Sequence, residues 1–257
     1  MITSKPTIVI IHGGWHVPES YEKLILALRN ADYEVHCPRL PTTNLSQPPN
    51  ADLYTDSDLV RTYVSSLVQA GRTVVVLLHT YGGQVGSNAL VGLGQETRTK
   101  EGLSGGVSHL IYLSGFALSE GVTMMEKVQE FGHMDLVPIS FDWADDGTCV
   151  HADPRTLLVG PSDLASDEVD EYVATLIRWN GKSMYQPSRH AAWREIPVAW
   201  VYTTQDMTVP FSYQKSFVED MEKAGRPVQT FEIATGHAPH LTATAGVVDA
   251  IQHVVNS

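Results

Sequence analysis

Short runs of β-branched and other apolar residues alternate along the chain with longer segments in which apolar residues recur every three or four positions. Continuous apolar runs are typical of strands covered on both faces, and the longer spacing is typical of helices that bury one face. The pattern therefore predicts an α/β fold, a mostly parallel sheet wrapped by helices. Six strands are expected, at Thr7–Ile11, Val35–Cys37, Val74–Leu78, His109–Leu113, Val198–Tyr202 and Val228–Ile233. Helices are expected at Glu19–Asn30, Asp56–Ala70, Val85–Leu93, Phe211–Ala224 and Thr242–Val255.

The alternation fails in two places. Pro41–Asn50 is a loop rich in Pro, Asn and Ser, and Ser119–Trp193 has no strand–helix rhythm apart from a helical stretch at Asp163–Trp179. An insertion between two strands leaves a sheet intact and lies at the strand ends where ligands bind. We therefore expect a core formed by residues 1–118 and 191–257, with residues 119–190 inserted as a helical cap or lid.

Composition narrows the choice of partners. The chain has 257 residues, which suits one main domain, and 17 basic against 29 acidic residues give a net charge of −12. That charge repels phosphate backbones and anionic lipid, so neither nucleic acid nor a membrane is expected as a partner. A small molecule is therefore the expected partner. Whether the chain forms a homodimer stays open.

Metals, disulfides and targeting segments are not expected either. Cys37 and Cys149 are far apart and form no zinc or disulfide pattern, and the histidines contain no metal-binding motif, so we expect no metal and no cofactor. The first apolar run is shorter than the core of a signal peptide or a membrane span. The sequence thus predicts a cytoplasmic protein.

A glycine pair follows the first strand directly, in the segment His12–Trp15 (HGGW). Two glycines permit unusual dihedral angles and close approach, so a backbone N–H can be directed at a substrate oxygen. Taken alone, an ordinary strand-ending turn explains the segment equally well.

The segment Leu78–Gly83 (LHTYGG) leads from a strand into a helix, which is where a nucleophile elbow occurs. The usual pattern is G-x-S-x-G, but here Thr80 stands at the position of Ser. An elbow nucleophile has a strained positive φ, which is unusual for a β-branched residue. A literal match at Gly102–Gly106 precedes a strand instead of following one, so we reject its Ser104.

Two further polar residues follow strands downstream. Asp206 comes after Val198–Tyr202, and His237 comes after Val228–Ile233. Separately, Asp206 could be a helix cap and His237 a surface histidine. Together with Thr80 they occur in the order nucleophile, acid, base, each just past a strand, which favours a catalytic triad.

On these residues the sequence resembles the α/β-hydrolase superfamily, and within it the small hydrolases that include plant methyl-salicylate esterases and hydroxynitrile lyases. It is most similar to fungal and bacterial members with an H-S-Y-G-G elbow. The likeness spans the chain through the segments IHGGW, LLHTYGGQVG, YLSGFAL, AAWREIPVAWVYTTQDMTVP and ATGHAPHLT.

The resemblance implies roles for individual residues. Thr80 occupies the nucleophile position, His237 that of the base and Asp206 that of the acid that orients the base. The backbone N–H groups of Gly14 and Tyr81 would form the oxyanion hole. Cyanohydrin cleavage is disfavoured, because hydroxynitrile lyases have a hydroxylated residue after the first His and a Lys after the catalytic His, whereas this chain has Gly13 and Ala238 there.

Thr80 leaves three interpretations open. It is an engineered replacement of Ser that slows acylation, a native nucleophile of a slow hydrolase, or a native residue of a scaffold with another activity. The expected function is serine-hydrolase-like cleavage of an ester or lactone of a small hydrophobic substrate, aromatic or polyketide-type. The alternative is a non-hydrolytic enzyme for cyclisation, isomerisation or C–C cleavage, or a receptor without turnover. Trp15 and the cap residue Trp143 are the expected substrate contacts.

Overall fold

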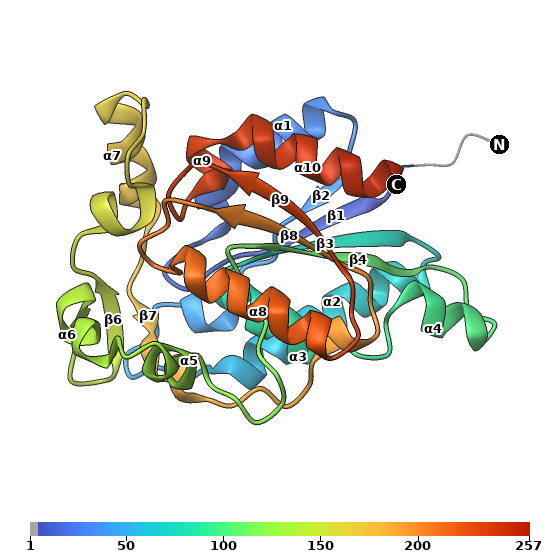
Figure 1. Cartoon of the computed structure of the whole chain (residues 1–257), viewed down its shortest axis with the longest axis horizontal. Coiled ribbons are helices and arrows are strands. Elements are labelled where there is room, and N and C mark those ends of the chain that lie inside the picture. Colours follow the sequence, from blue (N-terminus) through green and yellow to red (C-terminus); the bar gives the residue numbers. More distant parts are fainter. Residues whose placement is uncertain (1–4) are drawn as a thin grey trace.

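The computed structural model describes residues 5–257, in which a parallel sheet lies between two layers of helices and a cap covers one end of it (Figure 1). The strand order is β2-β1-β3-β4-β8-β9, and every pairing is parallel. All carboxyl ends therefore lie at the same edge, where the loops that follow them can meet. The strands are β1 (Thr7–Ile11), β2 (Val35–His36), β3 (Thr73–His79), β4 (Gly106–Leu113), β8 (Val198–Thr203) and β9 (Val228–Ile233).

The predicted strands are confirmed, with boundaries that shift by at most three residues. Alternate side chains of each strand enter two separate cores, as the twofold period of a strand requires. Ile8 and Ile10 of β1 pack in one core, whereas Val9 and Ile11 pack in the other. This double burial explains the uninterrupted apolar runs, and the parallel sheet between two helical layers confirms the predicted α/β class.

The helices divide between these two cores. Apolar side chains of α1 (Glu22–Asn30) and α10 (Thr244–Asn256) cover one face, and those of α2 (Leu53–Gln69), α3 (Tyr81–Ala89) and α8 (Phe211–Lys223) cover the other (Figure 1). Within the described residues, no helix is long and apolar enough to cross a membrane.

Two helix predictions need correction, and one short helix was not predicted. The helix expected from Glu19 divides into a 3-10 turn, Pro18–Tyr21, followed by α1. Helix α3 starts at Tyr81, four residues before the predicted start, because the glycines of its first turn hide the apolar period. The short α4 (Gln95–Lys100) was not expected, since its sequence QETRTK has no apolar side.

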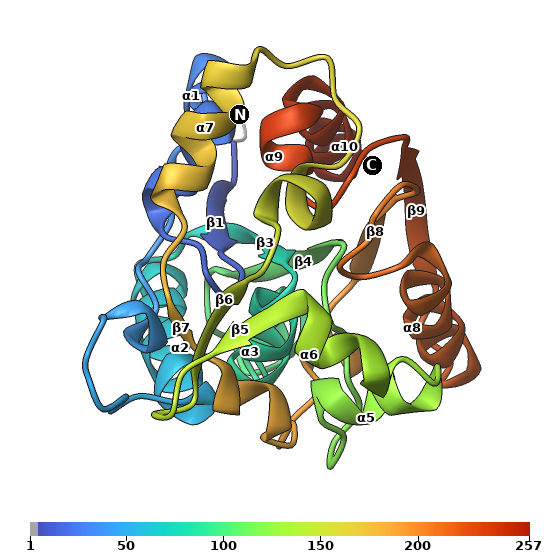
Figure 2. The same ribbon diagram turned by 90° about the vertical axis from the view of Figure 1, so that its left-hand side faces the viewer.

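The inserted region is only partly helical. Between β4 and β8 the chain forms α5 (Met124–Glu130), α6 (Val137–Ser140) and α7 (Ser166–Thr175), but also an antiparallel sheet of β5 (Phe141–Trp143), β6 (Thr148–His151) and β7 (Trp179–Asn180) (Figure 2). The inserted region thus contains helices, as expected for the cap, together with a small sheet that was not predicted. Strands this short contain too few residues to reveal a twofold period, and the helix expected to extend to Trp179 ends at Thr175.

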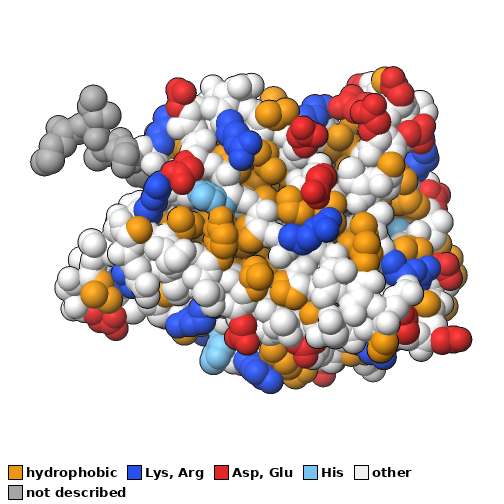
Figure 3. Space-filling model, turned by 180° about the vertical axis from the view of Figure 1, so that it is seen from behind, with side chains coloured by type: hydrophobic (Ala, Val, Ile, Leu, Met, Phe, Trp, Pro, Cys, Tyr) orange, Lys and Arg blue, Asp and Glu red, His pale blue; other side chains and the backbone are white. Residues whose placement is uncertain are grey.

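Acidic side chains are unevenly distributed over the surface. Seen from behind, they gather at the upper right of Figure 3, at the end where Figure 1 places α7. This helix carries Asp167, Glu168, Asp170 and Glu171. Part of the net negative charge thus lies on an outer helix of the inserted region.

Candidate active site

Thr80 forms a sharp turn between β3 and α3. Its dihedral angles are φ 47° and ψ −119°, and its side chain is only 2% exposed. The turn is tight because α3 starts between the ends of two strands: a Cβ on Gly82 would lie 2.2 Å from the carbonyl oxygen of Ile11, and one on Gly83 would lie 2.7 Å from the backbone nitrogen of Phe116. These close approaches fix the strained elbow geometry at a β-branched residue.

Asp206 and His237 form a buried hydrogen-bonded pair. His237 Nδ1 donates to Asp206 Oδ2 over 2.8 Å, and Oδ2 also accepts from Thr203 Oγ1. Asp206 Oδ1 accepts from the backbone N–H groups of Thr208 and Val209. With both oxygens engaged, the carboxylate holds the proton of a neutral His237 on Nδ1 and leaves Nε2 as an acceptor.

Nε2 of His237 has no hydrogen-bond partner among the described residues, although the side chain is only 1% exposed. In particular, Thr80 Oγ1 does not bond to it. The methyl group of Thr80 faces Gly13, where an added Cβ would lie only 2.0 Å from Thr80 Cγ2. Gly13 therefore provides the space that the extra methyl of Thr needs.

The two N–H groups expected in the oxyanion hole have no acceptor within residues 5–257. Tyr81 is the first residue of α3, so its N–H has no partner in the helix and lies at the positive end of the helix dipole. Gly14 lies under Trp179, whose ring would be 2.8 Å from a Cβ at that position. The oxyanion hole formed by these two N–H groups stays a prediction.

A buried carboxylate supports the side chain of Tyr81. Asp56 accepts hydrogen bonds from Tyr81 Oη at 2.8 Å and from the backbone N–H and Oγ1 of Thr42 at 2.9 and 2.6 Å. Trp179 Nε1 in turn donates to Thr42 Oγ1. Burial raises the pKa of Asp56 to about 7, although these hydrogen bonds oppose the rise. Sequence analysis missed Asp56, because a carboxylate within an amphipathic helix gives no sign that it is buried.

A chain of hydrogen bonds joins the glycine loop to the His237 loop. The N–H of Gly13 donates to Tyr21 Oη, which donates to His79 Nδ1 over 2.5 Å. His79 Nε2 then donates to the carbonyl oxygen of His237 over 2.8 Å. His79, the residue before Thr80, thereby connects the elbow to the His237 loop and, through Tyr21, to the glycine loop after β1.

The inserted region closes over the site. Trp15, which follows Gly14, donates from Nε1 to the carbonyl of Cys149 and accepts at its own carbonyl from the N–H of Ile177. Its ring lies 4.9 Å from that of Trp179 and 5.2 Å from that of Phe141. Aromatic side chains of the inserted region therefore pack with Trp15 over the glycine loop.

The second predicted substrate contact, Trp143, lies on β5. Its ring packs over Gly181 and is 6.4 Å from the ring of Tyr185. Trp143 shares a strand face with Phe141, which stacks on Trp15. Substrate contact by Trp143 and Trp15 stays a prediction.

Two polar residues beside the site gave no signal in the sequence. Ser114, at the end of β4, has a positive φ of 42° and a buried Oγ without a partner in the described part of the chain. The segment around Ser114 flanks the elbow. The carbonyl of Leu113 accepts from the N–H of Thr80, and the N–H of Phe116 donates to the carbonyl of Thr80. His151, on β6, is buried beside Trp15 with both ring nitrogens unpartnered among the described residues.

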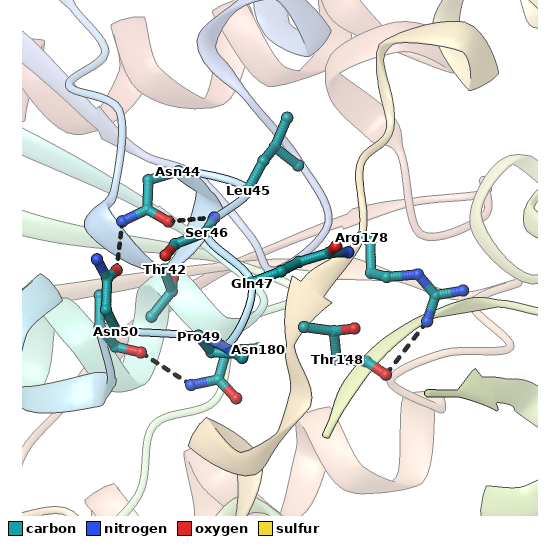
Figure 4. Close-up of a pocket in the computed structure, with 11 residues that line it drawn as sticks. Thr42, Asn44, Leu45, Ser46, Gln47, Pro49, Asn50, Thr148, Arg178 and Asn180 are labelled. Atoms are coloured by element: carbon teal, nitrogen blue, oxygen red, sulfur yellow. Dashed lines mark hydrogen bonds between the residues drawn. The ribbon is translucent and has the colours of Figure 1, made fainter. Parts of the chain in front are cut away.

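A separate pocket of about 310 Å³ opens between the 41–51 loop and the strands β6 and β7. Figure 4 shows that its polar side chains bond to their neighbours: Asn44 to Asn50, and Arg178 to the carbonyl of Thr148. Its lining contains none of the predicted site residues. Within residues 5–257, no three His, Cys, Asp or Glu side chains are grouped to hold a metal ion.

Residues 8–250 match the family described as the alpha/beta hydrolase family. The chain is 27% identical to a probable hydrolase, R7, of Phoma sp. over 251 residues, covering 96% of this chain and 97% of the relative. Among solved structures, polyneuridine aldehyde esterase superposes with a TM-score of 0.76 at 16% identity, covering 97% of this chain and 99% of the other. A pyrethroid hydrolase from Sphingobium faniae JZ-2 gives 0.73 at 20% identity, with 98% of both chains covered.

Proposed function

Because the chain belongs to the alpha/beta hydrolase family, we propose that it hydrolyses an ester or lactone of a small hydrophobic substrate by acyl transfer through Thr80, His237 and Asp206. The observation that carries this proposal is the buried Asp206–His237 pair, whose free Nε2 lies in a site with a strained Thr80 elbow.

In the proposed mechanism, His237 Nε2 takes the proton of Thr80 Oγ1 as the oxygen attacks the substrate carbonyl carbon. Asp206 fixes the tautomer of His237 and stabilises its protonated form. The tetrahedral oxyanion accepts hydrogen bonds from the N–H groups of Gly14 and Tyr81. His237 then protonates the leaving alcohol, and a water activated by His237 cleaves the acyl-enzyme.

This mechanism requires the Thr80 hydroxyl to turn toward His237. A nucleophile and its base must approach within about 3 Å, and such bonds often tighten only when a substrate binds. The methyl of Thr80 must be accommodated at the same time, and an error of about 1 Å in position can cost ~100-fold in rate. We therefore infer a slow hydrolase.

The substrate class follows from the surroundings of the elbow. Trp15, Trp179 and Phe141 offer aromatic surface next to the Gly14 N–H. Such walls suit an apolar ligand held by a few polar groups. The probable hydrolase of Phoma sp. and the esterase and pyrethroid hydrolase structures support hydrolysis in general, and the aromatic or polyketide-type substrate is our proposal.

The test compares four chains on p-nitrophenyl butyrate. Thr80→Ser removes the methyl, so kcat should rise by about 10- to 100-fold. Thr80→Val keeps the branched shape but removes the hydroxyl, and it should lose all turnover above background, as should His237→Ala. Equal rates for the parent chain and Thr80→Val would refute a Thr80 nucleophile.

A second candidate function is favoured by one specific observation, the missing hydrogen bond between Thr80 and His237. A free Nε2 beside unoccupied backbone donors could abstract a proton from the substrate itself and stabilise an enolate. That arrangement would serve cyclisation, isomerisation or C–C cleavage without an acyl-enzyme.

Exchange of substrate protons for deuterium from the solvent distinguishes the two functions once a carbonyl substrate is found. The second candidate predicts exchange of a proton next to the carbonyl in the parent chain and in Thr80→Val, but not in His237→Ala. Acyl transfer predicts no such exchange.

A further inference from the structure

His151 is a buried polar residue that the mechanism does not use. It ends β6, opposite Phe141 of β5, and only 7% of it is exposed. Neither Nδ1 nor Nε2 has a partner among residues 5–257. A buried polar group without a hydrogen bond costs about 1–3 kcal/mol, so this position calls for a ligand or a functional explanation.

The ring of His151 packs against two aromatic side chains and lines a small cavity. Its centroid is 4.2 Å from that of Trp15 and 5.2 Å from that of Phe141. Burial lowers the pKa of His151 well below its ordinary value. His151 is therefore neutral near pH 7, with one ring nitrogen to donate a hydrogen bond and one to accept.

The cavity that His151 and Trp15 line has a volume of about 150 Å³. Water occupies roughly 30 Å³, so the cavity has room for a group of a few non-hydrogen atoms. The lining is largely apolar: Trp15, Val150, His151, Pro154, Val173, Leu176 and Ile177. Since Trp15 Nε1 already bonds to Cys149, the unengaged side-chain hydrogen-bonding groups of this lining are those of His151. Both ring nitrogens are covered in this structure, so the ring must turn for one of them to meet a ligand in the cavity.

We propose that His151 determines specificity by hydrogen-bonding a hydroxyl or carbonyl group on a compact, otherwise apolar branch of the substrate that enters this cavity. The proposal rests on the proposed esterase function and narrows its substrate class. Trp15 joins the two sites, because it follows Gly14 in the chain and also lines the cavity. A substrate whose carbonyl reaches the Gly14 N–H can thus extend a short branch past Trp15 to His151.

The test uses two pairs of esters, in each of which one member carries a hydroxyl: added to the acyl chain in the first pair, and in place of the terminal methyl of the alcohol in the second. The acyl pair is p-nitrophenyl butyrate and p-nitrophenyl 3-hydroxybutyrate, and the alcohol pair is propyl butyrate and 2-hydroxyethyl butyrate, followed by acid titration. In the parent chain, kcat/KM should favour the hydroxylated member of at least one pair by about 10-fold or more, since a site built to bond a hydroxyl discriminates against its absence.

His151→Leu should abolish this preference while leaving the unhydroxylated ester within about threefold, and His151→Gln should restore part of the preference. The matched control is His109→Leu on β4, which makes the same change at a half-buried histidine whose Nδ1 also lacks a partner in the described part of the chain. This control should keep the ratio of the parent chain. Ratios near one for both pairs in the parent chain, or unchanged ratios in His151→Leu, would overturn the proposal.

A failure of hydrolysis itself is distinguishable. If neither the parent chain nor Thr80→Ser cleaves any of these esters, the proposed function is wrong, and binding decides the role of His151. The probes are N-(4-nitrophenyl)butanamide, its 3-hydroxy derivative and N-propyl- and N-(2-hydroxyethyl)butanamide, measured by calorimetry. Tighter binding of a hydroxylated amide that is lost in His151→Leu supports His151, and equal affinities within both pairs refute it.

Discussion

At the scale of single residues, Thr80 and Gly13 form a complementary pair. The methyl of Thr80 occupies the space that a side chain at position 13 would need, because Cγ2 would lie 2.0 Å from the added Cβ. Thr at the elbow is accommodated by a neighbour that has no side chain. An engineered replacement and a native Thr80 would both depend on this contact.

This contact predicts energetic coupling between the two positions. Gly13→Ala should destabilise the parent chain by about 3 kcal/mol through steric overlap, and markedly less in a Thr80→Ser background, which lacks the methyl. A double-mutant cycle from urea unfolding should give a coupling energy of about 1–3 kcal/mol. Additive changes would show that the methyl does not face Gly13.

The residues that follow strands could be identified from the sequence, because a strand run fixes where the next loop emerges. Thr80, Asp206 and His237 were found in this way, and the observed Asp206–His237 bond is consistent with their predicted roles. Asp56 and His151 could not be found. These two residues stand out only because segments distant in the chain bury them, as Trp15 does for His151.

At the scale of elements, Tyr21 ties the loop after β1 to the elbow and the His237 loop. Tyr21→Phe leaves the N–H of Gly13 and Nδ1 of His79 without their partner in a fully buried place. We expect a loss of about 1–3 kcal/mol in the free energy of unfolding, with a lower kcat on p-nitrophenyl butyrate. Urea unfolding and initial rates measure both effects.

Tyr63→Phe is the matched control for this change. Tyr63 Oη also bonds to a histidine nitrogen, Nδ1 of His36 over 2.6 Å, but this pair is only partly buried. Its loss should cost less than about 0.5 kcal/mol and leave kcat unchanged. Equal effects of the two substitutions would mean that the Tyr21 bonds have no special role in holding the site together.

The length of an element decides whether it could be predicted from the sequence. The core strands and most helices have clear periods, because each packs on the sheet with a long apolar face. The sheet of the inserted region has strands of two to four residues, in which a period cannot be recognised. Its formation depends on packing against Trp15 and on long-range pairing, neither of which the sequence pattern displays.

At the scale of the whole molecule, buried histidines make stability depend on pH. Burial lowers the pKa of His12 to about 4 and that of His16 to about 3, and it lowers those of His79 and His240 well below the ordinary value. The folded state keeps these rings neutral, whereas the unfolded chain protonates them below pH 6.5. Stability is therefore lost as the pH falls from about 6.5 toward 4.

Each such histidine should cost about 2 kcal/mol at pH 5, at 1.36 kcal/mol per pKa unit. Asp56 acts in the opposite direction, because its raised pKa destabilises the fold as the pH rises toward about 7. The histidines outnumber it, so the urea midpoint should be clearly lower at pH 5 than at pH 7.5. A midpoint that is equal or higher at pH 5 would contradict the burial of neutral histidines.

The most direct test of the central claim is an intact-mass measurement on the chain quenched in acid during turnover of p-nitrophenyl butyrate. Acyl transfer predicts a mass increase equal to one butyryl group, which peptide mapping assigns to Thr80, and no increase in Thr80→Val. The claim is contradicted if Thr80→Val releases nitrophenol as fast as the parent chain, or if the butyryl group is found on another residue.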